Sequence, residues 1–154
     1  MSSREAFGRC WPWIALTFIV VFAASVRYPL LDVPLDRDEG GYAYGGRVLL
    51  DGGATYRDFY TMRYPAIFGA YAVMMSVFGE SVWGIHFGLL VVVATTTLFT
   101  FLFARELFGD ATGVAAAAFF AVLQLGPRTE AFSANSEQFV IAFATPAMWL
   151  LWRA

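Results

Sequence analysis

Four runs of this chain carry no Asp, Glu, Lys or Arg, and they constrain the fold more than any other feature. They cover residues 11–26, 81–104, 111–126 and 138–152. A helix needs about 20 mostly apolar residues to cross a bilayer. Only 14% of the 154 residues are charged, whereas a soluble domain is about one quarter charged. Lipid must therefore replace water around much of the chain, and we expect an all-α membrane protein with about four transmembrane helices.

The runs divide the chain into segments. We expect a cytoplasmic N-terminus over residues 1–10, a first transmembrane helix over 11–31, a long outer loop over 32–80 and three further transmembrane helices over 81–154. This arrangement places four arginines on one side, and arginine-rich ends usually face the cytoplasm. They are Arg4, Arg9, Arg105 and Arg153. The first run is also compatible with a signal peptide, but no small-residue cleavage site closes it.

The outer loop is predicted to contain one or two interfacial helices. The first covers about residues 39–51, with Asp36 or Asp38 as its cap and Gly52 and Gly53 as its end. The second covers residues 65–79, with Pro65 in its first turn. It is too short for a full span, so an interfacial or re-entrant helix is favoured over a fifth crossing.

Several function classes find no support. No basic patch suits a nucleic acid, and the single cysteine, Cys10, excludes an internal disulfide and a multi-cysteine metal site. Nucleophile-elbow, phosphate-loop, dinucleotide and metalloprotease motifs are all absent from the sequence.

Carboxylates are the main candidates for chemistry. Asp38 and Glu39 follow the first apolar run, and Glu137 stands where the last run begins. Such groups can act as a general base or bind a divalent cation, for which Asp38 and Glu137 are candidate ligands. They are equally explained as acids that favour helix N-termini. No cofactor other than such a cation is indicated.

Arginines and aromatic residues supply candidate binding groups. Arg57, Arg63 and Arg128 suit phosphate, although lipid headgroups would attract them too. Tyr64 suits either an interfacial aromatic belt or stacking on a sugar. His86 lies near the outer end of its run, where a hydrogen-bonded helix residue is commoner than a ligand.

Several motifs form a recognisable set. They are Asp38–Glu39–Gly40–Gly41–Tyr42–Ala43, Leu49–Leu50–Asp51–Gly52–Gly53, Tyr56–Arg57–Asp58, Met62–Arg63–Tyr64–Pro65 and Gly84–Ile85–His86, with Glu137 further on. The set resembles the N-terminal part of GT-C fold glycosyltransferases, among them bacterial relatives of dolichyl-phosphate-mannose protein mannosyltransferases and of the lipid A aminoarabinose transferases. The resemblance runs from about residue 11 to the end of the sequence.

The resemblance implies a transferase of the plasma (inner) membrane that takes a sugar from a polyprenyl-phosphate donor and passes it to a glycan, lipid or protein on the outer face. Asp38 would act as the base, Glu39 would support it, and Arg63 would contact the donor phosphate. Arg57, Tyr64, His86 and Glu137 would complete the substrate site. This sequence departs from the family in placing Tyr64, not a basic residue, directly before the proline, and His86 where an arginine is common.

Two other functions remain open. Family members usually have many more spans, so the chain resembles a truncated form, and a non-catalytic membrane module or degenerate fragment is the main alternative to an enzyme. A small transporter is the third reading. It predicts polar or broken helices near the midplane, and the small residues of the apolar runs suit helix packing without requiring a substrate path.

Overall fold

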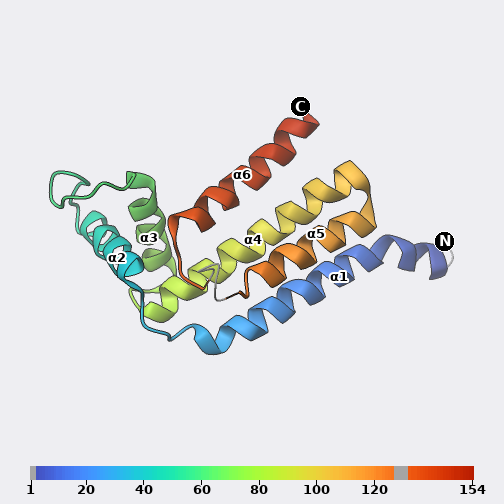
Figure 1. Cartoon of the computed structure of the whole chain (residues 1–154), viewed down its shortest axis with the longest axis horizontal. Coiled ribbons are helices and arrows are strands. Elements are labelled where there is room, and N and C mark those ends of the chain that lie inside the picture. Colours follow the sequence, from blue (N-terminus) through green and yellow to red (C-terminus); the bar gives the residue numbers. More distant parts are fainter. Residues whose placement is uncertain (1–2, 127–131) are drawn as a thin grey trace.

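The computed structural model describes residues 3–126 and 132–154, and these residues form helices joined by turns and loops (Figure 1). The elements are α1 (Ser3–Arg27), the 3₁₀ turn η1 (Tyr28–Leu30), α2 (Arg37–Leu50), α3 (Pro65–Phe78), α4 (Val82–Phe108), α5 (Asp110–Leu123) and α6 (Ser136–Arg153). Within the described ranges β-structure is limited to one isolated bridge, between Thr55 and Phe59. The all-α fold class expected from the sequence is confirmed.

The long helices form one elongated body, and α2 and α3 lie together at one end of it. In Figure 1, α1 and α5 run toward that end, whereas α4 and α6 run away from it. The opposite end therefore holds the start of α1, the turn between α4 and α5, and the end of α6. We call the end with α2, α3 and the start of α6 the polar end.

Two helices of the described chain have the length and composition to cross a membrane. They are the segment Cys10–Leu30 and α4, with 21 and 27 residues. The apolar helices α3 and α5 have 14 residues each, below the length of a typical span. The helix α6 has 18 residues and contains Pro146. The four apolar runs thus all form helices, but only two of these helices are spans by length and composition.

The helices of the polar end begin and end at conventional signals. Asp36 caps α2, because its carboxylate accepts from the Glu39 amide while the Glu39 carboxylate accepts from the Asp36 amide. This helix begins two residues earlier than expected, since Asp36 and not Asp38 is the cap. Pro65 opens α3, and Gly79 ends it with a positive φ of 94°.

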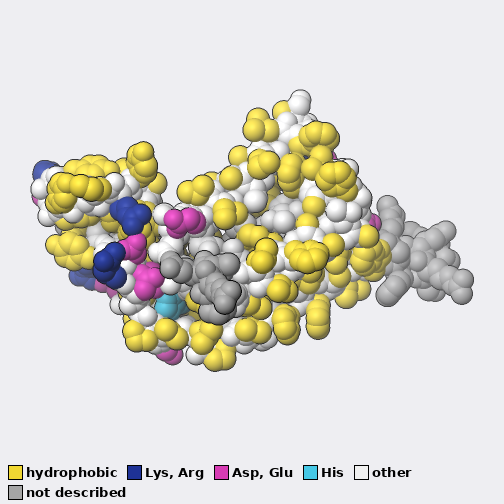
Figure 2. Space-filling model, viewed as in Figure 1, with side chains coloured by type: hydrophobic (Ala, Val, Ile, Leu, Met, Phe, Trp, Pro, Cys, Tyr) yellow, Lys and Arg dark blue, Asp and Glu magenta, His cyan; other side chains and the backbone are white. Residues whose placement is uncertain are grey.

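The body of long helices has a small apolar core and a close approach of two helices. Leu16, Phe101 and Ala117 form its buried cluster, with one residue each from α1, α4 and α5. Gly113 allows α5 to approach α4 closely, because a Cβ at that position would lie 2.7 Å from the Cβ of Arg105. Large apolar side chains cover the outside of these helices, as the space-filling view in Figure 2 shows.

The polar end has an aromatic core of its own. Tyr42, Phe68, Tyr71 and Phe139 are buried there and bring together α2, α3 and α6. The rings of Tyr42 and Tyr71 lie 5.6 Å apart, and those of Tyr71 and Phe139 lie 6.2 Å apart. Charged side chains gather on the surface above this core (Figure 2). The core therefore fixes the helix ends from which the candidate site is built.

Candidate functional site

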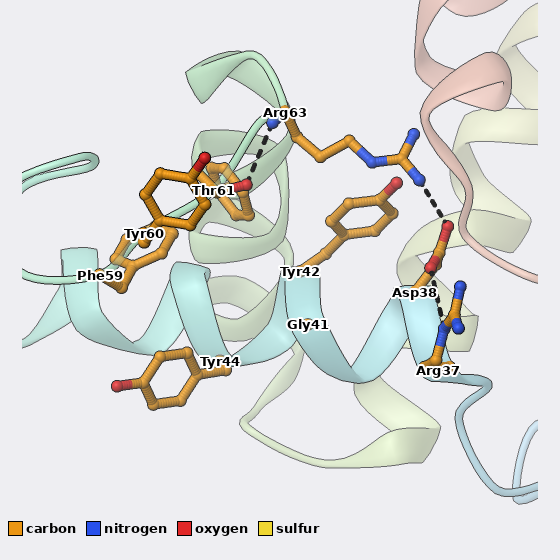
Figure 3. Close-up of a pocket in the computed structure, with 10 residues that line it drawn as sticks. Arg37, Asp38, Gly41, Tyr42, Tyr44, Phe59, Tyr60, Thr61 and Arg63 are labelled. Atoms are coloured by element: carbon orange, nitrogen blue, oxygen red, sulfur yellow. Dashed lines mark hydrogen bonds and ion pairs between the residues drawn. The ribbon is translucent and has the colours of Figure 1, made fainter.

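Asp38 and Arg63 form the central ion pair of the polar end. Asp38 lies in the first turn of α2, and its Oδ2 is 2.7 Å from an Nη2 of Arg63 (Figure 3). The two side chains are 38% and 52% exposed, so solvent reaches both partners. Arg37 lies farther from the same carboxylate, with 3.7 Å between its Nε and Oδ1. Asp38 is therefore an accessible carboxylate flanked by two guanidinium groups.

The loop before α3 holds Arg63 in position. The Tyr56 hydroxyl donates to the Arg63 carbonyl oxygen at 2.8 Å, and the Arg63 amide donates to Oγ1 of Thr61 at 3.1 Å. Tyr56 has a φ of 70°, which is uncommon for a residue other than glycine. The Arg63 guanidinium lies 5.8 Å from the centre of the Tyr42 ring, so the side chain crosses that ring to reach Asp38 (Figure 3).

Tyr42 connects the ion pair to the start of α6. Its ring is only 4% exposed, and burial raises the pKa of its hydroxyl. The charges of Asp38 and Glu137 raise this pKa further, while Arg63 and a hydrogen bond with the Ser136 side chain oppose the rise. Both acids are thus near enough to Tyr42 to affect its titration. The sequence reading did not select Tyr42, although its position four residues after Asp38 places both on one helix face.

Glu137 lies at the polar end with Asp38. It occupies the first turn of α6, is exposed, and accepts a hydrogen bond from Oγ of Ser136 at 3.3 Å. Helix α6 begins beside α3, as Figure 1 shows. The structure therefore brings together Asp38, Arg63 and Glu137 of the residues selected from the sequence.

Glu39 is placed differently from its neighbour. It is 1% exposed, and its Oε1 accepts from the Ala134 amide at 2.5 Å and lies 3.3 Å from Nε2 of His86. Its other oxygen accepts from the Asp36 amide. With both oxygens engaged inside the protein, Glu39 joins α2 to α4 and to the segment before α6. This arrangement suits a residue that positions Asp38 rather than one that contacts substrate.

His86 is part of the same buried network. It is 6% exposed, and its Nδ1 lies 3.0 Å from the carbonyl oxygen of Leu31. Its two ring nitrogens therefore face the end of the α1 segment and Glu39. The structure does not bring His86 to the exposed Asp38–Arg63 pair, because Leu31 and Glu39 engage its ring nitrogens inside the protein.

Arg57 and Tyr64 also lie apart from the ion pair. Arg57 is exposed on the loop and pairs with the adjacent Asp58, with 2.7 Å between Nη2 and Oδ2. Hydrogen bonds from Arg57 and from the Ala54 amide lower the pKa of Asp58. Tyr64 precedes α3 and is 87% exposed. Arg128 lies outside the residues that the structure describes.

A pocket of about 240 Å³ adjoins the ion pair between α2 and the loop that leads to α3. Figure 3 shows its lining, which consists of Arg37, Asp38, Gly41, Tyr42, Tyr44, Phe59, Tyr60, Thr61, Arg63 and Phe68. Charged groups gather on one side of it and aromatic rings on the other. Within residues 3–126 and 132–154, no three His, Cys, Asp or Glu side chains form a group suited to a metal ion.

Comparison with known proteins gives one match. A family model described as dolichyl-phosphate-mannose-protein mannosyltransferase matches residues 65–154. The matched part includes α3 to α6 with His86 and Glu137, and it begins just after Arg63. No curated protein and no solved structure matches the chain.

Proposed function

Because the chain belongs to the dolichyl-phosphate-mannose-protein mannosyltransferase family, we propose that it provides the donor side of a membrane glycosyltransferase active site. The family and the apolar helices make it a membrane protein of the glycosyltransferase kind. The donor in this proposal is a sugar on a polyprenyl phosphate, whose tail stays in the bilayer while its phosphate lies at the surface. The acceptor is a hydroxyl group outside the cytoplasm.

Asp38 is the proposed base. It accepts the proton of the acceptor hydroxyl as the hydroxyl oxygen forms a bond to the anomeric carbon, and the bond from that carbon to the phosphate oxygen breaks. Attack from the face opposite the phosphate inverts the anomeric centre. Its partly exposed carboxylate beside a pocket supports this role, because the base must reach a bound hydroxyl.

Arg63 is the residue proposed to bind the donor phosphate. The leaving phosphate gains negative charge as the bond to the sugar breaks, and a guanidinium stabilises that charge through paired hydrogen bonds. Arg63 pairs with Asp38 in the absence of substrate. A bound phosphate would compete for this guanidinium and leave the Asp38 carboxylate available to the acceptor. Arg57 and Tyr64, on the same loop, are proposed to contact the donor at points farther from Asp38.

Glu39, His86 and Glu137 have supporting roles in this proposal. Glu39 and His86 hold the first turn of α2 against α4, which fixes the direction of Asp38. Glu137 is proposed to bind acceptor hydroxyls across from Asp38. A divalent cation between Asp38 and Glu137 would require further ligands from the substrate or water, since the described part of the chain offers no group of three ligands there.

The polar end is proposed to face the outside of the plasma (inner) membrane. Arg105 and Arg153 lie at the opposite end of the long helices, and basic residues at helix ends usually remain in the cytoplasm. A polyprenyl donor presented on the outer leaflet would then reach Asp38 and Arg63 directly.

The observation that carries the proposal is the Asp38–Arg63 pair at the mouth of a pocket. The test replaces Asp38 with Asn in the full-length protein and measures transfer from a radiolabelled polyprenyl-phosphate sugar in membranes. Loss of a general base lowers the rate by roughly 10²–10⁴-fold. Asp32→Asn is the control, because Asp32 is exposed before α2 and does not line the pocket. Wild-type transfer by Asp38→Asn would exclude Asp38 as the base, whereas absence of transfer by the wild type itself would favour a non-catalytic membrane module.

A further inference from the structure

The aromatic side of the pocket identifies the chemistry of its ligand. We infer that this pocket binds a single sugar ring by stacking it on aromatic side chains and bonding its hydroxyls to the charged side. The inference rests on the proposed function and deepens it, since it names a substrate subsite and residues that select the substrate. It adds Tyr44, Phe59, Tyr60 and Gly41 to the site.

The tyrosine rings are available to a ligand, and ring contacts hold those of Tyr44 and Phe59 in place. Tyr44 and Tyr60 are 60% and 85% exposed although they line the pocket. Phe59 lies edge-on to Tyr44 at 6.1 Å and to Phe68 at 5.0 Å. Phe68 is 2% exposed and anchors this series of rings. A sugar ring has an apolar face of C–H groups, and fixed aromatic rings are the side chains that pack best against such a face.

The charged side of the pocket suits hydroxyl groups. Arg37 and Arg63 donate hydrogen bonds, the Asp38 carboxylate accepts them, and the Thr61 hydroxyl does both. Neighbouring hydroxyls of a sugar each donate and accept, so they match an alternation of carboxylate and guanidinium groups. A hydrocarbon tail would displace water from these polar groups and bring no hydrogen-bonding partner in its place, at a cost in free energy.

The size of the pocket limits the ligand. Sites for drug-sized molecules usually occupy about 300–1,000 Å³, and this pocket measures about 240 Å³. One sugar ring suits that space, and an extended chain does not. The aromatic belt of a membrane surface also explains exposed tyrosines, but it requires neither a pocket nor charged groups beside the rings.

Gly41 gives the inference a precise test. It lines the pocket on α2 between Arg37 and Tyr44, and a Cβ there would have no neighbour within 4 Å (Figure 3). A larger side chain at Gly41 would therefore extend toward the pocket without straining the backbone. Gly40 has equally open space, but it does not line the pocket. The two positions form a matched pair on one helix.

The experiment measures sugar binding without any transfer reaction. Methyl glycosides of mannose, glucose and arabinose are added to the full chain in lipid nanodiscs, and saturation-transfer NMR reports which ligand protons contact the protein. At least one glycoside should receive transfer, strongest at the protons of one ring face. Gly41→Leu should weaken its binding by about tenfold or more, with a smaller loss for Gly41→Ala, and Gly40→Leu should bind as the wild type does.

A second comparison separates the two possible sources of the ring. If the ring belongs to the donor, a short-chain polyprenyl-phosphate sugar should displace the glycoside, and if it belongs to the acceptor the two should bind together. Tyr44→Ala should lose binding in either case. The inference is overturned if no glycoside receives transfer or if Gly41→Leu and Gly40→Leu bind alike. Because the assay needs no donor turnover, its result is independent of whether Asp38→Asn abolishes transfer.

Discussion

At the polar end, side chains from several elements meet through directed hydrogen bonds, whereas α1, α4 and α5 pack mainly through an apolar cluster of Leu16, Phe101 and Ala117. Glu39 alone joins α2 to His86 of α4 and to Ala134 before α6. In α4 the hydroxyls of Thr95, Thr96 and Thr97 bond to carbonyl oxygens one turn earlier in the same helix. The hydroxyls of these three threonines are thus satisfied within the helix, so neighbouring helices need not supply partners for them.

The difference has a physical consequence for mutations. Stability is lost when the charge or geometry of a buried carboxylate with three partners changes, because amide groups are then buried without acceptors. A close contact at a small residue is instead destabilised when a substitution adds volume. The two regions should therefore respond to opposite kinds of substitution, and three variants test this, from the largest expected effect to the smallest.

Glu39→Leu should have the largest effect. The substitution removes the acceptor for the Asp36 and Ala134 amides and the partner of His86. Breaking a buried pair of this kind typically costs about 3–5 kcal/mol. Thermal unfolding of the purified protein in detergent measures the loss. Glu137→Leu is the control, because it removes an exposed acid from the corresponding turn of α6 and should cost less than about 1 kcal/mol. Equal losses would show that burial of Glu39 contributes nothing.

Gly113→Ala should have an intermediate effect. Its Cβ would lie 2.7 Å from the Arg105 Cβ and 3.0 Å from the Phe101 carbonyl oxygen, so α5 must move away from α4. Such overpacking costs about 1–3 kcal/mol. Gly69→Ala in α3 adds the same methyl group to open space and should instead stabilise the helix by up to about 1 kcal/mol. If both variants are stabilised, the close approach of α4 and α5 is not required by the fold.

Asp58→Asn should have the smallest effect and depend on pH. The exposed Asp58 accepts from Arg57 and from the Ala54 amide, and these bonds hold its pKa below the ordinary value of 3.8. A lowered pKa contributes stability above the unfolded value and loses it as pH falls through the folded value. Wild type and variant should therefore differ slightly in melting temperature at neutral pH and converge as the pH falls through the lowered pKa of Asp58. A difference that persists in acid would exclude the charge as its source.

Much of the architecture follows from local signals in the sequence. The uncharged runs, the cap at Asp36, Pro65 and Gly79 act within a few residues of where they stand, and each marks a helix or its boundary in the structure. The helix α1 begins at Ser3, but its part with the length and composition of a span is Cys10–Leu30, close to the predicted residues 11–31. The length of the apolar runs did not show that α5 would have only 14 residues.

The different environments of Asp38 and Glu39 could not be predicted from the sequence, because tertiary contacts determine them. Adjacent acids look alike in sequence, but one is partly exposed and the other is buried against residues 47 and 95 positions away. The pocket could not be predicted from local signals either, because Phe59 belongs to none of the motifs and meets Gly41 only when the loop folds back on α2. The proposed site roles of these residues remain predictions.

The bond between Glu39 and Ala134 also bears on synthesis of the protein. Its two ends are separated by 95 positions in the chain, and translation proceeds at about 5–20 residues per second, so the acceptor waits roughly 5–20 s for its donor. During that interval α2 lacks its hydrogen bond to the segment before α6. Tyr71, whose hydroxyl donates to the carbonyl oxygen of the same Ala134, waits as well. The polar end is therefore completed late in biogenesis. A ribosome stalled before residue 134 would leave the Glu39 carboxylate without the Ala134 amide.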